Sequence, residues 1–213
     1  MSEGVSIQNI TPGKVVSFGK GYDNKPIEWV VLSVENNQAL LFVRNKLCQK
    51  NGGFLSKVFD RQVGYWKSSE LCDWLNTAKP GNFLYDAFSP IERNAIVPSK
   101  YKIVQHKGLI MVHGGIDPDK LSEAFFKSKI FLLSASDLNT YKIAADMLST
   151  NPEGFGWWLR DLGKSHNQAL CVTKRNGWVV LSKEVFELLE VRPALKLKLT
   201  NKILNNSSFQ LKP

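Results

Sequence analysis

The sequence predicts a layered fold of short strands with a few helices between them. Short runs of β-branched and aromatic residues recur along the chain, and turn-forming residues such as Asn36 and Asn37 separate them. Fewer segments carry helix signals, and these lie between the strands. Residues 157–160 (WWLR) place two adjacent tryptophans on one strand, where neighbouring side chains point to opposite faces. Both faces of that strand must therefore be covered, which indicates a layered fold.

The first third of the chain predicts three strands. Residues 15–18 (VVSF) and 27–34 (IEWVVLSV) have strand composition, and the loop 19–26 between them is rich in turn formers. Residues 38–43 (QALLFV) return after the turn at Asn36 and Asn37. The second and third strands therefore form a hairpin.

Three helix starts follow from capping patterns. Ser68 or Ser69 precedes the segment 71–75 (LCDWL), whose apolar residues fall at i, i+3 and i+4. Residues 89–92 (SPIE) combine a serine cap, proline at the first helical position and glutamate three residues after the cap. Residues 134–137 (SASD) repeat the pattern with aspartate. Each serine is expected to begin a helix.

The rest of the chain predicts further strands within one domain. They are expected at residues 101–104, 109–112, 130–133, 157–160, 169–173 and 178–181. The segment 185–189 fits either a strand or a helix, and Pro193 marks an edge or an irregular strand. We expect a single domain over residues 1–213, with its core at about 11–199 and a loose C-terminal tail at 202–213.

Composition bounds the possible partners. A hydrophobic content of 43% with 12 Phe and 6 Trp suits a soluble globular domain. The net charge of +9 can attract nucleic acid, but the lysines and arginines are scattered along the chain, which argues against that partner. No signal peptide and no apolar run of about 18 residues is visible, so no membrane span is expected. The sequence indicates a cytoplasmic location, with display on a surface or a phage particle as the alternative.

The motifs as a set resemble a bacterial family of uncharacterised domains. The matching segments are 18–19 (FG), 29–32 (WVVL), 39–41 (ALL), 71–76 (LCDWLN), 87–89 (AFS), 130–134 (IFLLS), 157–160 (WWLR) and 191–195 (VRPAL). The final third is similar to the end of C-type-lectin-like domains, which include retroelement variable proteins and formylglycine-generating enzymes. The resemblance implies a C-type-lectin-like α+β fold. This chain departs from the family pattern at Cys72, Asp161 and Glu190.

The resemblance and the loop composition together point to a binding surface between the final strands. Trp157, Trp158, Arg160 and Arg192 are expected to be structural, because each lies among core residues. The expected ligand is a protein or a glycan, and the protein is expected to be a non-enzymatic recognition module. The candidate ligand-binding residues are polar or aromatic and lie in the loops after 157–160: Asp161, Lys164, His166, Asn167, Gln168, Lys174, Arg175, Asn176 and Trp178.

Two other functions are weighed against recognition. The first is an enzyme on the same scaffold, using Cys171 or a histidine, and the second is a basic nucleic-acid-binding protein. No catalytic motif, cofactor motif or metal-ligand spacing is visible, so no cofactor and no metal is expected. The segments 117–119 (DPD) and 151–153 (NPE) supply oxygen ligands of the kind calcium prefers, but the calcium motifs of lectins are absent.

Overall fold

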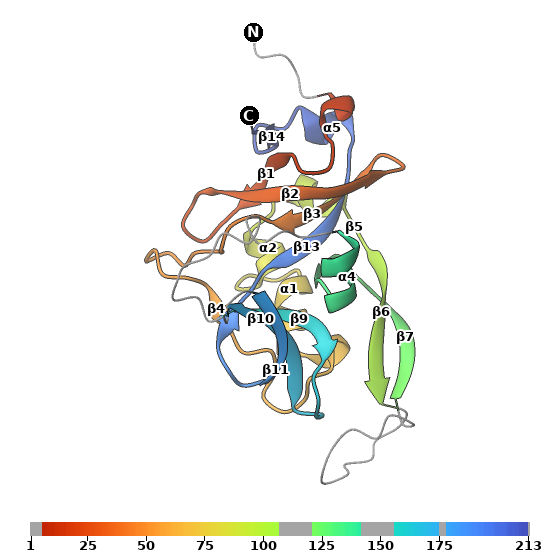
Figure 1. Ribbon diagram of the computed structural model, residues 1–213. Helices are drawn as coiled ribbons and strands as arrows, with labels where there is room; N and C mark the ends of the chain where they lie inside the picture. Colours follow the sequence, from red (N-terminus) through yellow and green to blue (C-terminus); the bar gives the residue numbers. More distant parts are fainter. Residues whose placement is uncertain (1–5, 107–120, 142–155, 175–177, 213) are drawn as a thin grey trace.

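The computed structural model of the protein describes residues 6–106, 121–141, 156–174 and 178–212, and Figure 1 shows their arrangement. The larger of its sheets has seven strands. Six follow the order β14-β1-β2-β3-β13-β5, and β8 also pairs with β13. The strands are β1 (Val15–Lys20), β2 (Pro26–Glu35), β3 (Gln38–Val43), β5 (Ile96–Val97), β8 (Ile130–Leu132), β13 (Pro193–Lys198) and β14 (Gln210–Leu211).

A five-stranded sheet and a two-stranded ribbon complete the β structure. The five-stranded sheet has the order β11-β10-β9-β12-β4, and the ribbon pairs β6 with β7. In Figure 1 the five-stranded sheet lies below the larger one, and the ribbon extends along one side. The strands are β4 (Ser56–Lys57), β6 (Ser99–His106), β7 (Leu121–Ser128), β9 (Trp157–Leu162), β10 (Gln168–Lys174), β11 (Trp178–Glu184) and β12 (Leu189–Glu190).

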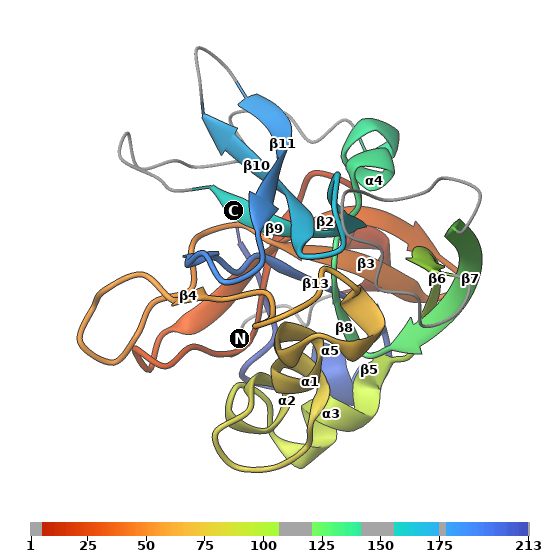
Figure 2. The same cartoon turned by 90° about the horizontal axis from the view of Figure 1, so that it is seen from below.

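The helices of the described residues are short, and their caps explain where they begin. Ser69 accepts the backbone N–H of Cys72, and capping boxes form at Ser89 with Glu92 and at Ser134 with Asp137. None of these helices is long and apolar enough to cross a membrane. They are α1 (Glu70–Asn76), α2 (Phe83–Asp86), α3 (Pro90–Ala95), α4 (Ala135–Thr140) and α5 (Asn201–Leu204), with 3-10 turns at Ile7–Asn9 and Trp66–Ser68. In Figure 2, α1, α2 and α3 lie together at one edge of the molecule.

The expected α+β, C-type-lectin-like fold is wrong. Among the described residues strand is far more abundant than helix, the strands form several antiparallel sheets, and each of the five α-helices there has only four to seven residues. The helix starts were predicted correctly, but extended backbone at Thr77 and Ile96 ends α1 and α3 after one or two turns. Helices this short do not form a flanking layer.

The tryptophan pair lies on β9 and is covered on both faces. Trp158 is fully buried and meets the ring of Phe59 edge-on at 5.5 Å between centroids. Trp157 points to the other face, where the guanidinium of Arg192 lies 5.0 Å from its ring centroid. The alternation of a strand therefore places one tryptophan in each of two packed layers.

Two segments differ from the sequence-based expectation. The tail expected to be loose includes β14, which pairs with β1, and Phe209, which is buried against Phe18 at 6.5 Å between ring centroids. Strand β7 was not anticipated, and it pairs with β6 along its whole length. The strand expected at 109–112 lies outside the described residues.

Candidate functional site

Several of the polar residues after β9 that were predicted to bind a ligand form hydrogen bonds within the protein instead. The carboxylate of Asp161 is partly buried and accepts the backbone N–H of Ala135 at 2.6 Å, at the start of α4. Burial raises the pKa of this carboxyl group, although the Ala135 N–H and the Arg160 charge oppose the rise. Asp161 therefore supports α4 rather than facing solvent.

The amides of Asn167 and Gln168 join β10 to β11. The Asn167 amide donates to one carboxylate oxygen of Glu184 at 2.7 Å, and the Gln168 amide donates to the other at 2.7 Å. The backbone carbonyl of His166 accepts the N–H of Gly64 at 2.6 Å. Of these candidates, Lys164 has the exposed side chain, and its backbone N–H donates to Ser182.

The remaining candidates lie at the tip of the same hairpin. Lys174 and Trp178 form the last backbone pair of β10 and β11. Their side chains, and all of Arg175 and Asn176, lie outside the described part of the structure. The oxygen-rich segments at 117–119 and 151–153 lie outside it as well.

The two arginines expected to be structural are buried and bonded to backbone carbonyls. Arg160 donates to the Leu132 carbonyl at 2.8 Å, forms an ion pair with Asp137, and lies 4.9 Å over the ring of Tyr101. It therefore links β9 to β8 and α4.

Arg192 makes the corresponding connection at the end of β3. Its guanidinium donates to the carbonyls of Val43 and Arg44 and lies 5.0 Å from the ring centroids of both Phe42 and Trp157. Burial lowers its pKa to about 10, which leaves the group charged at neutral pH. The arrangement joins the segment between β12 and β13 to the end of β3.

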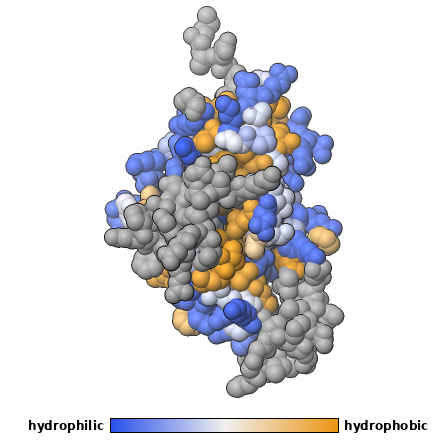
Figure 3. Space-filling model, in the orientation of Figure 1, coloured by the Kyte–Doolittle hydropathy of each residue, from blue (hydrophilic) through white to orange (hydrophobic). Residues whose placement is uncertain are grey.

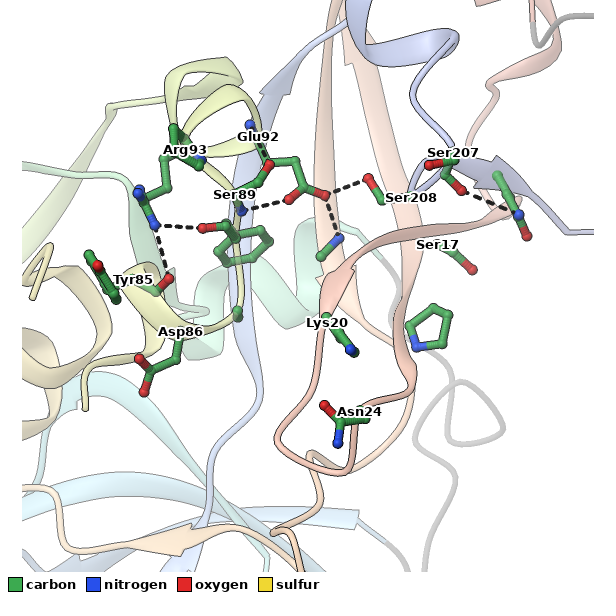
Figure 4. A pocket seen from close by; sticks show the side chains of 16 residues that line it. Ser17, Lys20, Asn24, Tyr85, Asp86, Ser89, Glu92, Arg93, Ser207 and Ser208 are labelled. Atoms are coloured by element: carbon green, nitrogen blue, oxygen red, sulfur yellow. Dashed lines mark hydrogen bonds between the residues drawn. The ribbon is translucent and has the colours of Figure 1, made fainter. Parts of the chain in front are cut away.

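A second candidate site is a cleft of about 590 Å³ between the β1–β2 hairpin, the α2–α3 segment and the C-terminal segment. We call it the hairpin cleft, and Figure 4 shows its lining side chains. Its volume is in the range typical of ligand sites. It is lined by Ser17, Gly19, Lys20, Asn24, Pro26, Tyr85, Asp86, Ala87, Phe88, Ser89, Pro90, Glu92, Arg93, Ser207, Ser208 and Gln210.

Glu92 joins the three segments that form the hairpin cleft. One carboxylate oxygen accepts the Gly19 N–H at 3.2 Å and the Ser208 hydroxyl at 2.6 Å, and the other accepts the Ser89 N–H at 2.7 Å. Gly19 has φ +73°, and a Cβ there would lie 2.5 Å from the Phe88 ring. Glycine therefore allows the hairpin to approach α2–α3 closely.

Ser17 brings an unused hydroxyl group to the hairpin cleft. The residue is 1% exposed, and its Oγ atom has no hydrogen-bond partner among the described residues. A buried hydroxyl without a partner costs roughly 1–3 kcal/mol, so native proteins rarely retain one without a reason. The Oγ atom exposes less than 1 Å² of surface, so a ligand in the cleft reaches it only if a neighbouring side chain moves.

Tyr85 and Arg93 form a fixed wall of the same cleft. Arg93 lies 4.7 Å over the Tyr85 ring and donates to the backbone carbonyls of Tyr85 and Phe88 at 2.9 and 2.6 Å. Tyr85 is still 40% exposed. Figure 4 shows Lys20 and Asn24 on the opposite side, on the hairpin. The wall is therefore rigid and aromatic, and the facing side is polar.

A cavity of about 610 Å³ adjoins the hairpin cleft, because Asp86 lines both. We call it the lysine cavity. The ammonium group of Lys57 lies 4.4 Å over the Trp74 ring, and burial lowers the pKa of this lysine. Burial and the neighbouring Asp86 carboxylate raise the pKa of Tyr22. The cavity is lined by Tyr22, Gln49, Lys50, Asn51, Leu55, Ser56, Lys57, Trp74, Gly81 and Asp86.

Cys171, the nucleophile considered in the enzymatic reading, is unsuited to that role. It is 0% exposed on β10, and burial raises its pKa to about 11. The thiolate that a nucleophile requires is therefore scarce at neutral pH and inaccessible.

Sequence reasoning did not identify either cavity. Their walls come from segments that are far apart in the chain, around residues 17–26, 49–57, 74–93 and 207–210. Residues 19–26 were interpreted only as a turn-rich loop, and 202–213 as a tail. One available signal was the serine-proline helix start at 89–92, whose glutamate is the residue that joins the walls of the hairpin cleft.

Comparison with known proteins places the chain in a family without assigning a ligand. No curated protein and no solved structure matches it, so a lectin-like or formylglycine-generating relative is not shown. The expectation of an uncharacterised domain family is confirmed. The match covers residues 36–199, which is most of the chain, and the protein belongs to the family described as a domain of unknown function (DUF6273).

Proposed function

We propose that this protein is a non-enzymatic recognition module that binds a glycan in the hairpin cleft. The observation that carries the proposal is an exposed, fixed aromatic ring at Tyr85 in a cleft whose facing side is polar. The ring offers a flat apolar surface to the C–H face of a sugar. The polar groups offer hydrogen bonds to sugar hydroxyls.

The polar lining of the hairpin cleft supports the same ligand class. Asn24, Ser207 and Gln210 carry amide or hydroxyl groups, which both donate and accept hydrogen bonds. Sugar hydroxyl groups also do both. The apolar lining from Pro26 and Phe88 adds surface for the less polar parts of a sugar. A few polar groups on a mostly apolar concave surface are typical of ligand sites.

The test is a glycan array followed by calorimetry on the glycans retained. Tyr85→Ala is expected to weaken binding about tenfold or more, which corresponds to ~1.4 kcal/mol. Phe125→Ala is the matched control, because Phe125 is 68% exposed on β7 and has Lys100 4.3 Å over its ring, as Arg93 lies over Tyr85. Equal loss in both variants, or no retained glycan, contradicts the proposal.

Protein recognition through the final strands is a second candidate, favoured by exposed apolar side chains there. Phe186 and Leu188 are 59% and 62% exposed in the turn after β11, and Val180 on β11 is also exposed. In Figure 3 the hydrophobic surface of this face gathers toward the middle of the molecule. The loops first expected to bind a ligand lie beside Phe186, because the N–H of the preceding Val185 donates to the Asn167 carbonyl.

Replacing Phe186 and Leu188 with serine tests this candidate independently of the hairpin cleft. A protein partner retained by the wild-type chain is expected to be lost with Phe186→Ser/Leu188→Ser and kept with Tyr85→Ala. Co-purification under identical conditions measures both. Retention by the serine variant contradicts docking at this surface.

A further inference from the structure

Lys57 carries a partly buried charge that forms no ion pair with any residue the structure describes. Among the described residues no carboxylate lies within ion-pair distance of its ammonium group, and burial is the cause that lowers its pKa. A cation that loses water without gaining an opposite charge is destabilised. An anion bound in the lysine cavity would offset this cost.

The position of the Lys57 ammonium group is fixed from both ends of the residue. Its backbone pairs with Leu189 of β12, and its carbonyl accepts the indole N–H of Trp158 at 2.9 Å. At the other end, the Trp74 ring beneath the ammonium group packs against Phe83 and donates its N–H to the Gly81 carbonyl at 3.1 Å. Such preorganisation lowers the entropy lost when a ligand binds.

The lysine cavity and the hairpin cleft share one lining residue, Asp86. Asp86 is already engaged, because it accepts the Gly81 N–H at 3.1 Å and interacts with the Tyr22 hydroxyl. A ligand that extends along the surface can therefore occupy both cavities. Such a ligand passes from the Tyr85 ring to the Lys57 ammonium group.

We propose that the glycan is acidic, with a uronate carboxylate paired to Lys57 in the lysine cavity while neighbouring sugars occupy the hairpin cleft. The inference rests on the proposed function and names its ligand class. Lys50, Gln49 and Asn51 line the same cavity and add a second cation and two amides for the carboxylate.

The experiment compares each uronate polymer, such as polygalacturonate, alginate or hyaluronan, with its carboxyl-reduced form. The two forms share a backbone and differ in the charged group. Wild-type protein is expected to bind a carboxylated form about tenfold more tightly or better, which corresponds to ~1.4 kcal/mol. Lys57→Met keeps the unbranched stem on Trp74 and is expected to lose this preference, whereas Lys57→Arg retains it.

Lys67→Met is the charge-matched control, because Lys67 is exposed on the 3-10 turn at Trp66–Ser68 and lines neither cavity. It is expected to keep the preference for the carboxylated form. Equal loss in Lys57→Met and Lys67→Met would indicate diffuse charge attraction and overturn the inference. Thermal melting of each variant confirms that it is folded.

The outcomes separate this inference from the proposed function. If wild-type protein binds both forms equally and Tyr85→Ala weakens both, glycan binding stands and the acidic specificity is overturned. If neither form of any polymer binds but neutral glycans do, the acidic specificity is likewise overturned. If no glycan of any kind binds, the proposed function fails with it.

Discussion

The indole N–H of Trp158 donates a 2.9 Å hydrogen bond to the backbone carbonyl of Lys57, a residue 101 positions earlier in the chain. Trp158 is fully buried in the core, whereas the Lys57 ammonium group lies in the lysine cavity. The most distinctive motif of the sequence therefore positions a candidate ligand-binding residue without contacting the ligand. Trp158→Phe tests this relationship.

Trp158→Phe removes the hydrogen bond and part of the ring. We expect the free energy of unfolding to fall by about 3 kcal/mol, from a lost bond and a small cavity. Under conditions where the variant is folded, its preference for carboxylated over carboxyl-reduced glycan is expected to fall as well. Urea unfolding and calorimetry measure the two effects, and an unchanged preference would contradict the positioning role.

Arg192→Met is expected to lower the free energy of unfolding by about 3 kcal/mol. The substitution leaves the carbonyls of Val43 and Arg44 without the guanidinium and removes a charge held between two rings. Arg61→Met is the control, since Arg61 is largely exposed and its ion pair with Glu70 is solvated. Similar losses in the two variants would show that Arg192 does not join the strands.

Asp161 is expected to make the free energy of unfolding depend on pH in the acid range. Burial raises its pKa above the ordinary value of 3.8, so the folded state binds this proton more readily than the unfolded state. The Asp161 contribution to the free energy of unfolding therefore decreases as pH rises through the folded pKa. Asp161→Asn keeps an acceptor for Ala135, and its stability relative to wild type should increase over that range. Parallel urea-unfolding curves across the pH series would contradict this.

The three cysteines are expected to differ in how fast they react with a thiol-labelling reagent. Cys72 and Cys171 are buried, and burial raises their pKa to about 12 and about 11. Iodoacetamide at neutral pH should therefore modify them only after unfolding, whereas the partly exposed Cys48 should react slowly in the native protein. Mass spectrometry of labelled peptides measures this. Rapid labelling of Cys171 in the native protein would again support the hypothesis of an enzyme that uses this cysteine as its nucleophile.

Phe209→Ala is expected to cost about 3–5 kcal/mol, because Phe209 is buried against Phe18. It should also weaken glycan binding, since the neighbouring Ser207, Ser208 and Gln210 line the hairpin cleft. Lys202→Ala, on an exposed position of α5, should change neither property. A small effect of Phe209→Ala on unfolding would indicate a C-terminal segment that is independent of the fold.

Local signals predicted local structure well. The capping residues Ser69, Ser89 and Ser134 begin helices as expected, and the hairpin of β2 and β3 forms around Asn36 and Asn37. The fold class was wrong because caps mark where a helix begins and say little about its length. The arrangement of sheets depends on pairings such as β13 with β3 and β8, which join distant segments.

The candidate site was harder to predict for the same reason. Glu92 was recognised only as a capping residue, yet its carboxylate also binds Gly19 and Ser208, which lie 73 and 116 positions away. Ser17 belongs to no sequence motif. That its hydroxyl group has no hydrogen-bond partner among the described residues can be seen only once its neighbours in space are known. Loop composition after β9 suggested a ligand surface, but several of those side chains bond to Glu184 or support α4.

The hairpin cleft is built where β1 meets β14. The two strands pair, and Figure 1 shows them at one end of the molecule. The α2–α3 wall belongs to the matched region 36–199, whereas residues 17–26 and 207–210 flank it. Under the proposed function, exchanging exposed positions of the flanking segments, such as Lys20, Asn24 and Ser207, is expected to change ligand choice while the buried Phe18 and Phe209 keep the core. Grafting these positions between relatives is then a route to altered recognition.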